Sequence, residues 1–85
     1  MKKIKFFMFD SCPYCQLALG YLKELQSEDK YKNIEIEMIN ERKQPEVAEQ
    51  YDYYYVPTFY VDEEKIHEGS AKKKDVQRVL DLALG

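Results

Sequence analysis

Two cysteines separated by two residues stand where an apolar run gives way to a helical pattern. A near-continuous apolar run, Ile4–Phe9, precedes Cys12, and apolar residues at helical spacing, between Ala18 and Leu25, follow Cys15. This order predicts that the pair lies at the turn from a buried strand into a helix. A helix start presents backbone N–H groups without intrahelical partners, together with the positive end of the helix dipole. A thiolate, the reactive form of cysteine, is stabilised in such a place.

The spacing of the pair fits the capping positions of a helix start. Cys12 falls at the N-cap, and Pro13 supports the start at the first helical position, where its missing N–H costs nothing. Cys15 falls at the third helical position, so its backbone N–H and its thiol can both face the Cys12 sulfur. Asp10 either caps this turn or places a negative charge that opposes a Cys12 thiolate. The stretch therefore predicts a redox site.

Length and charge limit the kinds of partner that this chain can have. The 85 residues predict one small domain, 1–85, and a net charge of −3 argues against nucleic acid. The start, Met1-Lys2-Lys3 before the apolar run, imitates a signal peptide, but the run is too short and ends at Asp10. No stretch is long enough to cross a membrane. We therefore expect a cytoplasmic protein, in which a Cys12–Cys15 bridge would be transient and catalytic.

Strands and helices are predicted to alternate along the chain. The predicted strands are Ile4–Phe9, Ile34–Ile39, Thr58–Val61 and Lys65–Glu68, and the predicted helices begin at Pro13, at Pro45 and after Gly69. The first helix is expected to end near Asp29, and its length implies a parallel, right-handed crossover between the first two strands. The second strand alternates apolar and acidic residues, as at a sheet edge. The fold class is α/β, in the order βαβαββα, with a four-stranded mixed sheet and helices on both faces.

The last helix has a clear inner face but an ambiguous start. Its apolar positions follow the spacing i, i+3, i+4 and i+7, and they are Val76, Val79, Leu80 and Ala83. Ser70 is a candidate N-cap, although Lys72, Lys73 and Lys74 would then oppose the helix dipole in the first turn. These three lysines are either a solvated charge run or anion contacts at the mouth of the site.

Three motifs together resemble the glutaredoxins of the thioredoxin superfamily. They are Cys12-Pro13-Tyr14-Cys15 after the first strand, Val56-Pro57 before the third, and Gly69 after the fourth. The similarity spans essentially the whole chain, and the tetrapeptide is typical of dithiol glutaredoxins. The resemblance implies a thioredoxin fold and an enzyme that reduces glutathione mixed disulfides and protein disulfides. Glutathione would be the co-substrate, with no bound cofactor and no metal.

The resemblance also implies a role for individual residues. Cys12 matches the nucleophile, and Cys15 matches the thiol that resolves the mixed disulfide with a protein. Pro57 matches the cis-proline of the family, beside which the backbone of Val56 pairs with an extended substrate. Tyr14 matches an aromatic wall of the glutathione groove.

The same groove would also include Tyr55 and Ser70. The partners implied are glutathione and disulfide-containing proteins, and the chain is expected to be a monomer that binds neither membrane nor nucleic acid.

Some positions depart from the glutaredoxin pattern. Phe9 stands where many glutaredoxins have a basic residue, and Tyr55 stands where many have threonine. Gly69 is followed by Ser70 instead of a second glycine, and the next aspartate is only Asp75. The Val-Pro-Thr sequence that ends at Thr58 is closer to thioredoxin, although the chain has no tryptophan. The alternative is a thioredoxin-like reductant that a flavin-dependent thioredoxin reductase recharges.

A non-enzymatic alternative is a dimeric metal or iron–sulfur module with Cys12 as a ligand. Structural zinc needs four ligands, and beyond the two cysteines the chain offers His67 as its single histidine, which is expected at the surface. Tyr53, Tyr54 and Tyr55 either form a wall for substrate or pack beneath their own loop.

Overall fold

Seven elements follow one another in the predicted order in a computed structural model that describes residues 1–85. They are β1 (Ile4–Met8), α1 (Pro13–Gln26), β2 (Ile36–Asn40), α2 (Pro45–Ala48), β3 (Thr58–Val61), β4 (Glu64–Glu68) and α3 (Lys73–Leu84). The sheet has the strand order β2-β1-β3-β4, with β1 and β2 parallel and the other pairs antiparallel. The predicted four-stranded mixed sheet is confirmed.

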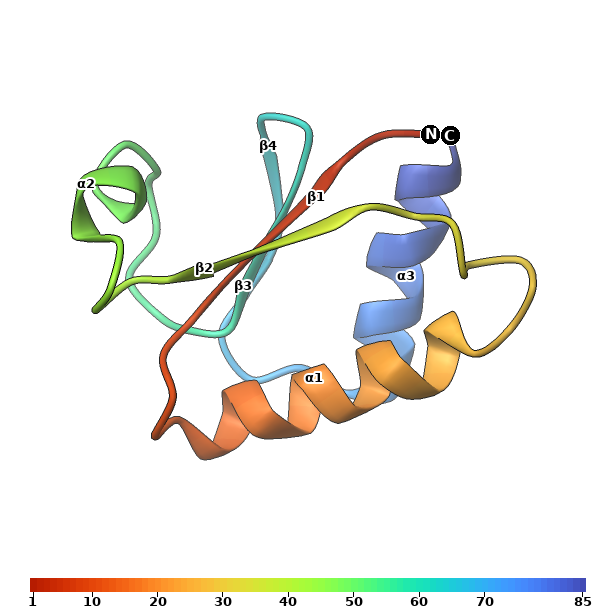
Figure 1. Ribbon diagram of the computed structural model, residues 1–85, viewed down its shortest axis with the longest axis horizontal. Helices are drawn as coiled ribbons and strands as arrows, with labels where there is room; N and C mark the ends of the chain where they lie inside the picture. The colour runs from red at the N-terminus through yellow and green to blue at the C-terminus, as the bar shows by residue number, and fades with distance from the viewer.

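Neighbouring phenylalanines of β1 serve the two faces of the sheet, because successive side chains of a strand point in opposite directions. Phe6 lies in the larger core with Leu22 of α1 and Val79 of α3, and its ring is 4.9 Å from that of Phe59. Phe7 lies in a smaller core on the other face, with Ala48 of α2 and Tyr60. Figure 1 shows α1 and α3 on one side of the sheet and α2 on the other. This two-sided burial explains why β1 is almost continuously apolar.

The first helix ends earlier than predicted, at Gln26 instead of near Asp29. The backbone N–H of Ser27 donates to Glu24, and its hydroxyl donates to the same carbonyl at 2.6 Å. A serine side chain that binds the last turn in this way competes with further helical bonds. The second strand is also shorter than predicted, since Ile34 is buried in the connection before β2.

The last helix begins at Lys73, so the prediction of Ser70 as its N-cap is wrong. Lys72 holds the N-cap position, and its backbone N–H donates to the Asp75 carboxylate at 2.9 Å. That carboxylate offsets the unfavourable lysines of the first turn. Gly69 has a φ of +91°, a conformation that other residues rarely adopt, and it turns the chain from β4 toward α3.

The two ends of the chain lie side by side, at the end of the molecule opposite the β1–α1 turn (Figure 1). The backbone N–H of Lys2 donates to the carbonyl of Ala83 at 2.7 Å. None of the helices combines the length and the apolar character that crossing a bilayer would require.

Candidate redox site

The two cysteines occupy the capping positions predicted for them. Cys12 is the N-cap of α1 in an extended conformation, and Pro13 holds the first helical position. The backbone N–H of Cys15 donates to the Cys12 sulfur at 3.1 Å. One of the free donors of the helix start therefore points at this sulfur, and a negative charge on it is stabilised by this bond and by the helix dipole.

The two thiols are not equivalent. Both are nearly covered, but the Cys15 thiol lies deeper in the larger core, with 1% of its surface exposed against 4% for Cys12. Burial raises the pKa of the Cys15 thiol to about 12, and its hydrogen bond with the Cys12 sulfur adds to this. Cys15 is therefore a protonated thiol at neutral pH.

This asymmetry predicts how the folded protein reacts with iodoacetamide. Between pH 6 and 9, roughly one thiol per chain should be alkylated, at Cys12, because only thiolate reacts. The thiol of Cys15 should react only on unfolding or as the pH approaches 12. The same raised pKa stabilises the folded state fully below the ordinary thiol pKa, and this contribution is lost as the pH rises toward 12.

Mass spectrometry of the alkylated chain, with the Cys12→Ser variant as control, measures this order. Equal modification of both thiols in the folded protein at pH 7 would contradict it.

Val56, in the segment before β3, has a backbone N–H and C=O that are free to pair. The N–H groups of Tyr54 and Tyr55 donate to the Glu68 carboxylate, and the carbonyl of Tyr55 accepts from the Thr58 hydroxyl. The N–H and C=O of Val56 form no hydrogen bond, while its side chain packs against the core cluster that contains both cysteines. An extended chain could pair with these two groups.

Pro57 follows Val56 through a cis peptide bond and is fully buried. Its carbonyl accepts from the backbone N–H of Gly69 at 2.8 Å, which joins the start of β3 to the end of β4.

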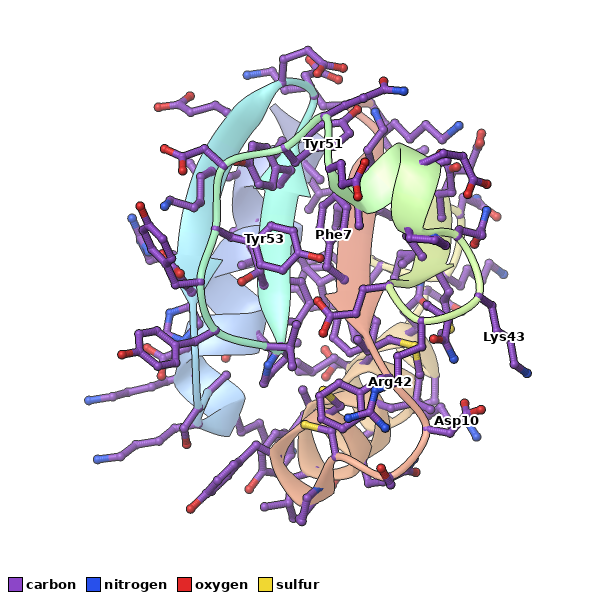
Figure 2. All side chains as sticks on the ribbon, turned by 90° about the vertical axis from the view of Figure 1, so that its left-hand side faces the viewer. Phe7, Asp10, Arg42, Lys43, Tyr51 and Tyr53 are labelled. Carbon is purple, nitrogen blue, oxygen red and sulfur yellow. The ribbon has the colours of Figure 1, made fainter.

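The tyrosines of this region divide between core and surface. Tyr53 packs on Phe7 with ring centroids 4.8 Å apart, and its hydroxyl donates to Glu41 at 2.8 Å (Figure 2). Tyr54 and Tyr55 are mostly exposed, at 85% and 71%. Tyr14, in the first turn of α1, is also exposed. Packing therefore accounts for Tyr53, whereas the other three rings are free to contact a partner.

Ser70 is exposed, and its carbonyl contacts the ring nitrogen Nε2 of His67 at 3.0 Å. Among the lysines that follow, Lys73 pairs with Glu24 of α1 at 3.1 Å.

Arg42 reaches the redox site from the β2–α2 connection, a contact that the sequence analysis missed. Its guanidinium lies 4.0 Å from the centroid of the Phe9 ring, and Nη1 lies 3.5 Å from the Ser11 hydroxyl. Figure 2 shows Arg42 directed toward the turn that holds Asp10, before α1. Arg42 forms no ion pair, whereas its neighbour Lys43 pairs with Asp10 at 3.5 Å. The positive charge of Arg42 thus lies over Phe9, the residue that stands where many glutaredoxins have a basic side chain.

Asp10 connects two loops instead of capping α1. One carboxylate oxygen accepts from the Asn40 amide at 3.1 Å, and the other faces Lys43. Its charge is therefore partly balanced by Lys43 and does not stand alone beside Cys12.

No three His, Cys, Asp or Glu side chains come together in this chain in a way that could hold a metal ion. A pocket of about 380 Å³ lies apart from the cysteines, lined by residues of α2, by the Tyr51–Tyr54 stretch, and by Glu41 and Arg42.

The sheet, the cysteine pair at the start of α1 and the proline before β3 define the thiol oxidoreductase form of the thioredoxin-like fold. The chain belongs to the thioredoxin domain family, whose model matches residues 2–81. No curated protein matches the chain in sequence.

Solved structures give the same fold. The oxidised thioredoxin of Plasmodium falciparum is 16% identical with a TM-score of 0.76, covering 99% of this chain and 82% of that one. The thioredoxin-like protein BC3987 is 23% identical with a TM-score of 0.68, covering 91% and 99% of the two chains. Thioredoxin 1 of Thermosipho africanus is 25% identical with a TM-score of 0.61, covering 98% and 99%.

Proposed function

We propose that this protein is a thiol–disulfide oxidoreductase that reduces glutathione mixed disulfides and protein disulfides with electrons from glutathione. The observation that carries the exchange chemistry is the hydrogen bond from the Cys15 backbone to the Cys12 sulfur at the start of α1. This bond and the helix dipole favour the thiolate at the more exposed of the two cysteines.

The reaction is two successive thiol–disulfide exchanges. The Cys12 thiolate attacks one sulfur of the substrate disulfide, forms a mixed disulfide with it, and releases the other sulfur as a thiolate. A second thiol then resolves the mixed disulfide. With a glutathione mixed disulfide as substrate, Cys12 carries the glutathionyl group, and a second glutathione attacks the glutathione sulfur, which returns Cys12 as a thiolate and forms glutathione disulfide. With a protein substrate the second thiol is Cys15, which loses its proton as its sulfur bonds to that of Cys12 and the substrate leaves as a thiolate, and two glutathione molecules then return the dithiol state and leave as glutathione disulfide.

Three features support glutathione as the electron donor. The Cys-Pro-Tyr-Cys sequence is the glutaredoxin form of the motif, and Tyr14 is exposed beside Cys12. Arg42, which forms no ion pair, holds its cation over Phe9, three residues before the cysteine that would carry glutathione. Because glutathione carries two carboxylates, such a cation would attract it.

A second candidate keeps the chemistry and changes the donor. Thioredoxins are among the structural neighbours, and Phe9 and the Gly69-Ser70 pair depart from the glutaredoxin pattern. These features favour a thioredoxin-like reductant that accepts electrons from a flavin-dependent thioredoxin reductase.

Paired turnover assays on one preparation test the two donors. One assay supplies NADPH, glutathione reductase, glutathione and a glutathione mixed disulfide, and the other supplies NADPH, thioredoxin reductase and a protein disulfide. We expect turnover in the first. Turnover only in the second would mean that the electron donor is thioredoxin reductase and not glutathione. No turnover in either, with metal or cluster bound at half an equivalent per chain, would favour the dimeric binding module.

Replacing Arg42 tests the contribution of its charge. Arg42→Gln should raise the KM for the glutathione mixed disulfide about threefold with little change in kcat, as expected for an exposed ion pair. The effect should shrink in roughly 0.5 M salt, which screens exposed charges. Lys43→Gln is the matched control, because Lys43 is adjacent and already paired with Asp10. An equal rise of KM in both variants would mean that the net charge of the protein, and not the position of Arg42, sets the KM.

A further inference from the structure

Glu68 connects the end of β4 to the backbone of the segment that precedes Pro57. One of its carboxylate oxygens accepts from the N–H groups of both Tyr54 and Tyr55, the latter at 3.0 Å. The other oxygen accepts from Lys65 at 2.8 Å. All of these are charge-assisted hydrogen bonds, which are stronger than neutral ones. These bonds hold the pKa of Glu68 far below its usual range, at about 2, so the carboxylate is charged at neutral pH.

The segment that Glu68 holds has little else to fix it. The rings of Tyr54 and Tyr55 are mostly exposed, so they bury little surface that would anchor their backbone. The other contacts of the segment are the bond from Thr58 to the Tyr55 carbonyl, the bond from Gly69 to the Pro57 carbonyl, and the packing of the Val56 side chain against the core. Glu68 lies opposite Thr58 in the β3–β4 register, which places its side chain within reach of the segment. Glu68 is thus the only side chain that binds the N–H groups on this side of Val56.

These contacts decide which backbone groups remain available to a substrate. Glu68 occupies the two N–H groups before Val56, and Thr58 occupies the carbonyl before it. The N–H and C=O of Val56 are left free, on a segment whose direction is set by the carboxylate.

We propose that Glu68 is a positioning residue, which fixes the Tyr54–Val56 backbone so that Val56 presents its free N–H and C=O to an extended disulfide substrate beside Cys12. The role rests on the proposed oxidoreductase function. Glu68 does not touch the reacting sulfurs, whose environment is set by α1. It should therefore affect the binding of a peptide or protein disulfide and leave the reactivity of Cys12 unchanged.

The test compares Glu68→Ala and Glu68→Gln with Glu64→Gln as the matched control. Glu64 is an exposed glutamate at the other end of β4 whose side chain forms no hydrogen bond or ion pair. With a protein disulfide as substrate, Glu68→Ala should raise the KM about tenfold, the loss expected for one or two charge-assisted bonds, with kcat changed less than about twofold. Glu68→Gln keeps an acceptor oxygen and should show an intermediate KM. The control should match the wild type.

Two further readouts separate positioning from general destabilisation. The rate at which iodoacetamide modifies Cys12 should stay within about twofold in every variant, since a structural failure would alter the helix start as well. Amide hydrogen exchange of Tyr54 and Tyr55 should become faster in Glu68→Ala and remain slow in the control.

The possible results distinguish a failure of the positioning role from a failure of the proposed oxidoreductase function. An unchanged KM in Glu68→Ala, or unchanged exchange at Tyr54 and Tyr55, would overturn the positioning role. If Glu68→Ala unfolds, the KM of Glu68→Gln decides. A wild-type protein without turnover would overturn the proposed function, and the exchange measurement would still report whether Glu68 holds the segment.

Discussion

Replacing Cys12 with serine is expected to abolish disulfide exchange with every substrate, by at least about a thousandfold, because the attacking nucleophile is lost. Serine is among the preferred N-cap residues, so its hydroxyl should take over the hydrogen bond from the Cys15 backbone. The variant should therefore fold with nearly the wild-type stability, and the loss should be purely chemical. Turnover with a glutathione mixed disulfide and thermal unfolding measure the two expectations.

The Cys12→Ser variant still contains Cys15, which makes the result informative. Residual activity above the uncatalysed rate would mean that the buried Cys15 thiol can attack disulfides, against its raised pKa. A strong fall in stability would mean that the helix start depends on sulfur at this position and would leave the kinetic loss uninterpretable as chemistry alone.

Replacing Cys15 with serine is expected to separate the two substrate classes. Reduction of a protein disulfide should fall at least about a hundredfold, because an intramolecular thiol acts at a far higher effective concentration than free glutathione. Turnover of a small glutathione mixed disulfide should stay within about threefold of wild type, since glutathione itself can resolve it. The backbone N–H that donates to Cys12 is unchanged by this substitution. The paired turnover assays give both numbers.

Ala18, one turn further along α1, offers a control for damage to the packing of the helix. It is fully buried in the same cluster as Cys15 and carries no thiol. Ala18→Ser should lower stability and affect both substrate classes equally. If Cys15→Ser behaves in the same way, with both activities lost together, Cys15 has a structural role, and the resolving role is wrong.

The fold could be predicted from the sequence because its strongest signals are local and agree with one another. The continuous apolar run of β1 indicated a strand with two covered faces, and Phe6 and Phe7 do face two different cores. The inner positions of α3, from Val76 to Ala83, are all buried as the periodicity predicted. The misplaced helix boundaries arose from side-chain competition. Ser27 binds the last turn of α1, and Asp75 binds the backbone of Lys72, so that α3 has its N-cap two residues beyond the expected Ser70.

Only part of the candidate site could be predicted from the sequence. The relation between Cys12 and Cys15 follows from positions within one helical turn, so spacing was enough to predict it. Arg42 and Glu68 come from elsewhere in the chain, and their contacts depend on the paths of exposed loops. For Arg42 no spacing pattern gave a signal. Glu68 could have been found, since a β3–β4 hairpin with the predicted turn places it opposite Thr58, next to the Val56-Pro57 motif.

The meeting of the chain ends has a practical consequence for handling this protein. Lys2 and Ala83 are hydrogen-bonded at one end of the molecule, and β1 leads from there to Cys12 at the other end. A tag, a fusion partner or a surface linker at either terminus would therefore lie at the end of the molecule away from Cys12. A short linker would also suffice to join the termini, so new ends could be opened in the exposed Ser27–Lys30 turn without cutting the segments that form the thiol site.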